Sequence, residues 1–76
     1  MTAQKRIDFL KLKLTEDLVA ILVEEQHLSI EKAFSLLYNS ETYARLSNPN
    51  TKLYIQSTGY VYSVLEDELK QKNTLL

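Results

Sequence analysis

Apolar residues recur with helical spacing over the first third of the chain. When successive residues are turned by 100°, one set falls on a continuous stripe and a second set on another side of the same helix. The stripe predicts one long helix ending near Gln26. A helix on the surface needs only one apolar side. The second strip therefore predicts a central helix or a dimer interface. The stripe is Ile7, Leu10, Leu14, Leu18, Ile21 and Leu22, and the second strip, the dimer-face candidate, is Phe9, Leu12, Val19 and Val23.

The same region permits a second interpretation. Residues 10–14 alternate apolar and basic side chains with the period of two that is typical of a strand. Thr15, followed by Glu16 and Asp17, would cap a helix starting at residue 16. That pattern predicts a strand followed by helices. The continuous helix is favoured because its stripe crosses Thr15 without a change of phase.

Shorter elements are predicted in the rest of the chain. Ser29 is a suitable N-cap for a second helix, and Ser40 begins a short third one. Residues 48–51 predict a turn, because proline fixes its own φ and disfavours helical backbone in the residue before it. Ser57 can cap a last helix, while residues 53–56 are compatible with an extended segment or a single turn. The apolar faces are Ile30, Ala33, Phe34 and Leu37, then Tyr43 and Leu46, then Val61, Leu65 and Leu69.

These elements predict an all-α fold, a small bundle of three to four helices with a tyrosine-rich irregular linker. The 76 residues form one domain, 1–76, whose tail 71–76 is expected to fray because it lacks a cap. A chain this short buries only roughly 60% of its unfolded surface, so a partner or a dimer would add stability. The longest apolar run, 18–23, is far below the roughly 20 residues of a membrane span, and with no cysteine we expect a cytoplasmic protein.

All five tyrosines lie between residues 38 and 62. A buried tyrosine needs a partner for its hydroxyl, so these rings either join the linker to the helices or face another molecule. Tyr38 and Tyr43 could pin the break between two helices by packing on Phe34. Tyr60 and Tyr62 point about 200° apart on a helix, so at most one joins its inner face. Because tyrosine is enriched at interaction hot spots, the partner-binding candidates are Tyr38, Asn39, Tyr43, Tyr54, Gln56, Tyr60 and Tyr62.

The net charge of −1 is unevenly distributed. Residues 1–13 carry four bases against Asp8, a balance of +3, and the remainder of the chain carries −4. This is sparser than the dense cluster that marks a strong nucleic-acid footprint, and a solvated face explains it more simply. The nucleic-acid candidates, which belong to the strand of the second interpretation, are Lys5, Arg6, Lys11 and Lys13.

The residue types argue against an enzyme. The chain has one histidine, one glycine and no cysteine, so it offers neither a nucleophile with an adjacent base nor a glycine-rich phosphate loop. His27 fits a helix C-terminus. The acidic run 66–68 points in directions 100° apart, which cannot converge on one ion, and we expect it to be solvated. No cofactor and no metal are predicted.

Several segments together resemble a signature of small uncharacterised bacterial proteins. They are Leu37-Tyr38-Asn39-Ser40-Glu41-Thr42-Tyr43, Leu53-Tyr54-Ile55-Gln56-Ser57, Tyr60-Val61-Tyr62 and Leu65-Glu66-Asp67-Glu68-Leu69. The organisation, over roughly residues 14 to 69, is similar to short helical proteins encoded beside putative toxin genes of the ADP-ribosyltransferase-like kind. The resemblance implies an antitoxin-like or accessory role in a toxin–antitoxin or mobile-element system. It assigns no functional residues.

The strand-first interpretation resembles the ribbon-helix-helix repressors, in which a strand such as residues 5–14 pairs with its dimer mate and lies in the DNA major groove. Lys11 and Lys13 would then face the groove. Two departures stand against this: the segment 15–29 is about one turn short for the first helix, and the tyrosine-rich half has no role. The sequence therefore predicts a non-enzymatic module that binds another protein and permits a homodimer, with a dimeric DNA-binding repressor as the alternative.

Overall fold

The computed structural model describes residues 3–72, and within that range it is all-α, with four helices and no strand. The predicted small bundle is therefore confirmed. Two single turns of 3-10 helix form the tyrosine-containing linker between the third and fourth helices. The elements are α1 (Ala3–Gln26), α2 (Ile30–Tyr38), α3 (Glu41–Ser47), η1 (Pro49–Thr51), η2 (Leu53–Ile55) and α4 (Thr58–Gln71).

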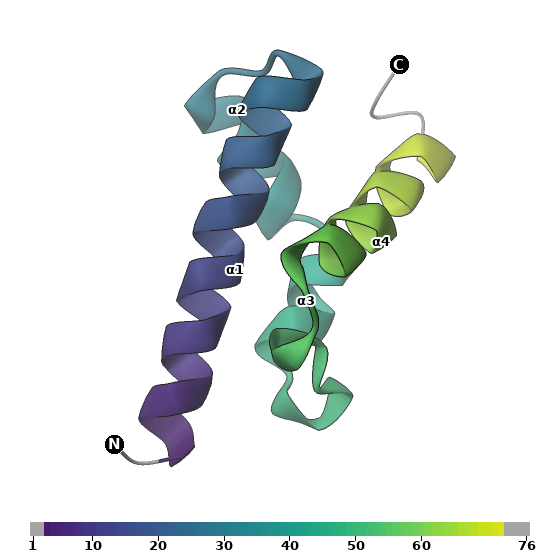
Figure 1. Cartoon of the computed structure of the whole chain (residues 1–76). Helices are drawn as coiled ribbons and strands as arrows, with labels where there is room; N and C mark the ends of the chain where they lie inside the picture. Colours follow the sequence, from purple (N-terminus) through teal and green to yellow (C-terminus); the bar gives the residue numbers. More distant parts are fainter. Residues whose placement is uncertain (1–2, 73–76) are drawn as a thin grey trace.

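The long helix α1 sets the shape of the molecule. Its 24 residues span about 36 Å, close to the 40 Å length of the whole fold. In Figure 1 it stands as a rod at one side, with α2 folded back behind its C-terminal half and with α3 and α4 on the other side. The helix contacts α2, η2 and α4. It is thus the helix against which these other elements pack.

Residues 5–14 are helical throughout, so the strand of the ribbon-helix-helix interpretation is wrong. Apolar packing explains the outcome, because Leu14 and Leu18 are buried on the same face of one continuous helix. Arg6 and Lys13 share one side of α1, whereas Lys5 and Lys11 leave the helix in other directions, so the four bases do not form one row. Lys11 lies 3.9 Å from Asp8, and Lys13 lies 3.9 Å from Asp17.

Serine caps start the three shorter helices, as the sequence predicts. The hydroxyl oxygens of Ser29, Ser40 and Ser57 each accept a hydrogen bond from a backbone N–H three residues later, at 3.1, 3.0 and 3.2 Å. Each bond satisfies one of the amides that a helix N-terminus leaves without an internal partner. Past α1, His27 adopts left-handed backbone with φ 56°, which turns the chain toward α2.

Among residues 3–72, eleven apolar side chains form the core, and their positions follow the predicted faces. From the stripe of α1, Leu14, Leu18 and Leu22 are buried, whereas Ile7, Leu10 and Ile21 are half-buried. A buried Thr15 donates its hydroxyl hydrogen to the Lys11 carbonyl oxygen at 2.8 Å. The complete core is Leu14, Leu18, Val19, Leu22, Ala33, Leu37, Leu46, Leu53, Val61, Leu65 and Leu69.

The second strip of α1 is divided by the position of α2. Val19 is 7% exposed and Val23 is half-buried, while Phe9 and Leu12 are 57% and 58% exposed. Val19 therefore belongs to the core, and it cannot be a freely exposed dimer-face residue. The division arises because α2 is only nine residues long and folds back over the C-terminal half of α1.

The last helix extends into residues 71–76, the tail that the sequence predicts to fray. Gln71 is helical and Lys72 forms the C-cap. Residues 73–76 lie outside the described part of the chain. Among the helices of residues 3–72, none is long and apolar enough to cross a membrane.

Candidate protein-interaction site

Two neighbouring hollows form a cleft between α1 and the turn η2. They have volumes of about 390 and 260 Å³, and they share four lining residues. The N-terminal half of α1 supplies Arg6 and Leu10 as one wall, and η2 supplies Tyr54 and Ile55 as the other. We call this the α1–η2 cleft; its principal lining residues are Arg6, Leu10, Lys13, Tyr54, Ile55 and Gln56.

The α1–η2 cleft combines an apolar floor with charged edges. Ile55 is 58% exposed, whereas Tyr54 is half-buried and packs against the core. Asp17 lies at one end, where it accepts a hydrogen bond from the Thr58 hydroxyl at 3.1 Å. A surface that mixes aromatic, aliphatic and arginine side chains is typical of protein-binding hot spots.

A third hollow, separate from the α1–η2 cleft, lies between α1 and α2. It has a volume of about 390 Å³ and is almost wholly apolar, with a glutamate at each edge on the α1 side. Ile30, at its α2 edge, is 60% exposed. We call this the α1–α2 groove; it is lined by Glu16, Val19, Ala20, Val23, Glu24, Ile30 and Phe34.

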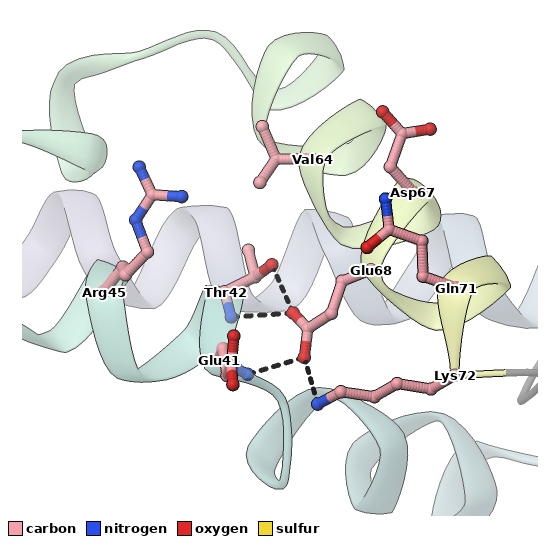
Figure 2. Close-up of a pocket in the computed structure, with 8 residues that line it drawn as sticks. All are labelled: Glu41, Thr42, Arg45, Val64, Asp67, Glu68, Gln71 and Lys72. Atoms are coloured by element: carbon pink, nitrogen blue, oxygen red, sulfur yellow. Dashed lines mark hydrogen bonds and ion pairs between the residues drawn. The ribbon is translucent and has the colours of Figure 1, made fainter.

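The junction of α3 with α4 is polar, unlike the α1–η2 cleft and the α1–α2 groove. Figure 2 shows the Glu68 carboxylate of α4 pointing at the first turn of α3. One of its oxygens accepts from the Thr42 amide at 2.9 Å and the Thr42 hydroxyl at 2.7 Å, and the other accepts from the Glu41 amide and from Lys72 Nζ, at 2.7 and 2.8 Å. The carboxylate thus caps a helix that is distant in sequence.

These hydrogen bonds determine the acidity of Glu68. Burial, which leaves its side chain 12% exposed, would by itself raise the pKa. The hydrogen bonds from Lys72, from the Thr42 hydroxyl and from the amides of Glu41 and Thr42 outweigh burial and lower the pKa of Glu68 from 4.5 to about 2. The same ion pair raises the pKa of Lys72.

The sequence prediction that residues 66–68 are solvated is wrong for Glu68. Asp67 is exposed, and Glu66 lies 3.7 Å from Lys70 within the same helix. The Glu68 carboxylate instead accepts hydrogen bonds from the first turn of α3, where Thr42 lies 26 residues earlier in the chain. Local sequence gave no signal for this role, because helical geometry describes the neighbours of Glu68 within α4 but not the helix that packs beside it.

The tyrosines lie in separate groups, and the sequence candidates do not make one surface. Tyr38 packs on Phe34 with ring centroids 5.4 Å apart, and Tyr43 meets Tyr38 edge-on at 4.9 Å. The predicted packing on Phe34 at the α2–α3 break is confirmed for Tyr38, and the ring of Tyr43 packs on Tyr38. Asn39 caps the end of α2 by donating its amide hydrogen to the Ser35 carbonyl oxygen at 2.8 Å.

On α4, the two tyrosines diverge as the helical spacing predicts. Tyr62 is half-buried, and its hydroxyl oxygen accepts from Gln26 Nε2 at 3.2 Å. Tyr60 is 52% exposed on another side. Of the seven partner-binding candidates, only Tyr54 and Gln56 line the α1–η2 cleft, and sequence reasoning did not include Ile55 or Leu10.

The described residues show no built site for a metal ion. Across positions 3–72, no three His, Cys, Asp or Glu side chains lie together in a way that could hold one. Among the same residues, no buried side-chain polar atom lacks a hydrogen-bond partner.

Comparison of the chain with family models, with curated proteins and with solved structures found no match.

Proposed function

We propose that this protein is a non-enzymatic interaction module that binds a partner protein through the α1–η2 cleft. The observation that carries the proposal is the cleft itself, in which exposed Ile55 and half-buried Tyr54 face Arg6 across a hollow of about 390 Å³. An exposed aliphatic side chain next to aromatic and arginine side chains is a frequent composition for an interaction site.

The construction of the cleft supports protein binding over small-molecule binding. Tyr54 is anchored on the core, so an aromatic anchor is held in place before the partner arrives and loses little conformational freedom on binding. The cleft is formed on the surface between a helix and a turn, and its charged groups, Arg6, Lys13 and Asp17, stand among the lining residues. Such charges direct the orientation and rate of association more than they add affinity.

The partner class is suggested by resemblance alone. Segments such as Leu37–Tyr43 and Leu53–Ser57 resemble small bacterial proteins encoded beside putative toxins, which supports an antitoxin-like or accessory role. The residue types support a role without catalysis, since the chain has a single histidine and no cysteine. We accordingly propose that the partner is the product of a neighbouring gene.

Affinity purification with quantitative mass spectrometry tests the proposal. Tagged wild-type chain is compared with Ile55→Glu, which places a charge in the cleft, and with Tyr60→Glu as the matched control. Tyr60 is similarly exposed, at 52% against 58%, and lies outside the cleft. We expect one polypeptide to be retained by wild type and by Tyr60→Glu and to be lost with Ile55→Glu.

The captured polypeptide is then purified and titrated against each variant by calorimetry. Loss of a central anchor should weaken binding by about 30-fold or more, as hot-spot residues do. Equal recovery of every protein by wild type and Ile55→Glu would exclude the cleft as the binding site. Turnover of a substrate by the purified chain would exclude the non-enzymatic role.

A further inference from the structure

The charges of α1 run against the dipole of the helix. Residues 3–13 hold four bases and one acid, a balance of +3, and residues 14–26 hold four acids and no base, a balance of −4. A helix is stabilised by acids near its N-terminus and by bases near its C-terminus. The first turn of α1 has no acid and its last turn has no base. This distribution costs stability in the isolated helix, and a helix of the opposite charge order packed beside it would offset that cost.

The uncovered apolar groups of α1 divide in the same way as its charges. Phe9 and Leu12, both more than half-exposed, lie in the basic half, whereas the α1–α2 groove lies in the acidic half with Glu16 and Glu24 at its edges. An occupant that matches this groove has an apolar side chain flanked by bases. The N-terminal half of α1 has that chemistry.

We infer that α1 pairs antiparallel with α1 of a second copy of this chain, so that Phe9 of each copy enters the α1–α2 groove of the other. The pairing sets the +3 half of each helix beside the −4 half of its mate. Apart from Lys13, which borders both surfaces, it uses residues outside the α1–η2 cleft and so goes beyond the proposed function.

The spacing of Phe9 and Val23 along α1 fits a two-fold symmetric pair. Phe9 and Val23 are 14 residues apart, about 21 Å along one rigid helix, and residue 16 is midway between them. A two-fold axis near Glu16 therefore brings both phenylalanines to both grooves at once, as an isologous dimer requires. The strip 9, 12, 16, 19, 23 also has the alternating spacing of three and four residues that is characteristic of paired helices.

Glu16 is the one acid on this seam, and the axis brings its two copies together. Lys13, one turn earlier and now 3.9 Å from Asp17, is close enough along the helix to meet the carboxylate of the other copy. The centre of the pair thus alternates in charge. The seam permits the antiparallel arrangement and disfavours a parallel one, which would set the bases of one copy against those of the other.

Sedimentation equilibrium tests the dimer with three forms of the full chain. We expect wild type to dimerise and Phe9→Glu, which brings a carboxylate to the acidic groove, to weaken association at least about 30-fold. The matched control is Tyr60→Glu, a change at an equally exposed ring that should leave association unchanged. Circular dichroism verifies that Phe9→Glu stays folded, as its 57% exposure implies.

Charge pairing is tested separately with Glu24→Lys. Because the groove edge would then repel the basic half of the mate, the dissociation constant should rise by about fivefold or more. Glu66→Lys, with the same change of charge on α4, is its control. An equal response of the two variants would contradict the pairing of opposed halves.

Single cysteines determine the direction of the helices, and the chain has none of its own. In the antiparallel pair Glu16→Cys lies near the axis and should form a disulfide-linked dimer on mild oxidation. Leu12→Cys would lie about 12 Å from its mate along the helix and should not. Efficient linking through Leu12→Cys would show a parallel pair, and a monomeric wild type at 200 µM would overturn the inference. Neither result bears on the proposed function, which the purification with Ile55→Glu tests separately.

Discussion

At the α3–α4 junction, polar atoms of the two helix ends form hydrogen bonds with one another, whereas along the outer side of α1 apolar side chains lie beside a groove that none of residues 3–72 fills. The Glu68 carboxylate accepts four hydrogen bonds and is almost buried. Phe9 and Leu12 are more than half-exposed. The first region is complete within a single copy, and the second has the composition of a surface that another molecule covers.

Under the proposed function, this contrast separates the residues that stabilise the domain from those that bind. A chain of 76 residues has little apolar material for a core, and here charged hydrogen bonds at the junction supplement eleven buried apolar side chains. The groove and the cleft hold apolar groups that the core leaves uncovered. Substitutions at the junction should therefore change folding, and substitutions at the exposed surfaces should change association.

The largest expected effect is that of Glu68→Gln. The amide keeps the shape of the side chain but loses the charge that its hydrogen-bond donors face, and a pKa lowered from 4.5 to about 2 corresponds to stabilisation on the order of 3 kcal/mol. We expect the free energy of unfolding at pH 7 to fall by about 2–3 kcal/mol, measured by urea denaturation. The control Glu66→Gln removes a 3.7 Å surface ion pair and should cost less than about 0.5 kcal/mol. Equal losses of unfolding free energy in the two variants would show that Glu68 stabilises the fold no more than a surface glutamate does.

The same difference should disappear in acid. Because the folded pKa of Glu68 is depressed, its contribution is fully present above the unfolded pKa of 4.5 and is lost as pH falls toward about 2. The gap in unfolding free energy between wild type and Glu68→Gln should therefore close between about pH 5 and pH 2. Urea titrations at pH 7, 4 and 2.5 measure it. A gap that stays constant with pH would mean that shape, and not charge, stabilises the junction.

Within the second strip of α1, Val19→Ala and Leu12→Ala separate the core from the exposed surface. Val19 is buried beneath the groove, so the lost methyl groups and the cavity should cost about 1–2 kcal/mol. Leu12 is 58% exposed and should cost less than about 0.5 kcal/mol in the monomer. Thermal unfolding at low protein concentration compares them. A larger loss for Leu12→Ala would mean that α1 buries this residue within the monomer.

Tyr62→Phe removes one hydrogen bond between α4 and α1. The hydroxyl accepts from Gln26 at 3.2 Å in a partly buried setting, so we expect a loss of about 0.5–1 kcal/mol in urea denaturation. Tyr60→Phe, in which the ring remains exposed, should be neutral. If the two variants respond alike, the Tyr62 hydroxyl is not an element of the α1–α4 contact.

The one substitution expected to stabilise the protein is Gly59→Ala. Gly59 lies in the first turn of α4 without positive φ, and an added Cβ would meet no atom within 4 Å. Alanine should raise the unfolding free energy by about 0.5–1 kcal/mol by restricting the unfolded chain. Thermal denaturation provides the measurement, and a lowered melting temperature would contradict this view of the α4 N-terminus.

The sequence by itself determined the local structure of this protein. Ser29, Ser40 and Ser57 begin helices because a serine hydroxyl satisfies a free amide next to it in the chain, and the apolar face of each helix follows from its period of 3.6 residues. Leu14, Leu18 and Leu22 were predictable as core for that reason. Tyr54 was among the candidates for binding because tyrosine is common at interfaces, and Gln56 because its amide can form hydrogen bonds with a partner.

Only the tertiary structure decided which helix faces which. Glu68 caps α3 and Val19 is buried because α4 and α2 happen to pack there, and both contacts join residues that the local pattern leaves unrelated. The same packing brings Arg6 opposite Ile55 and leaves Phe9 uncovered. Helical periodicity acts over a few residues, whereas the surfaces proposed for binding are set by side chains that meet across the fold.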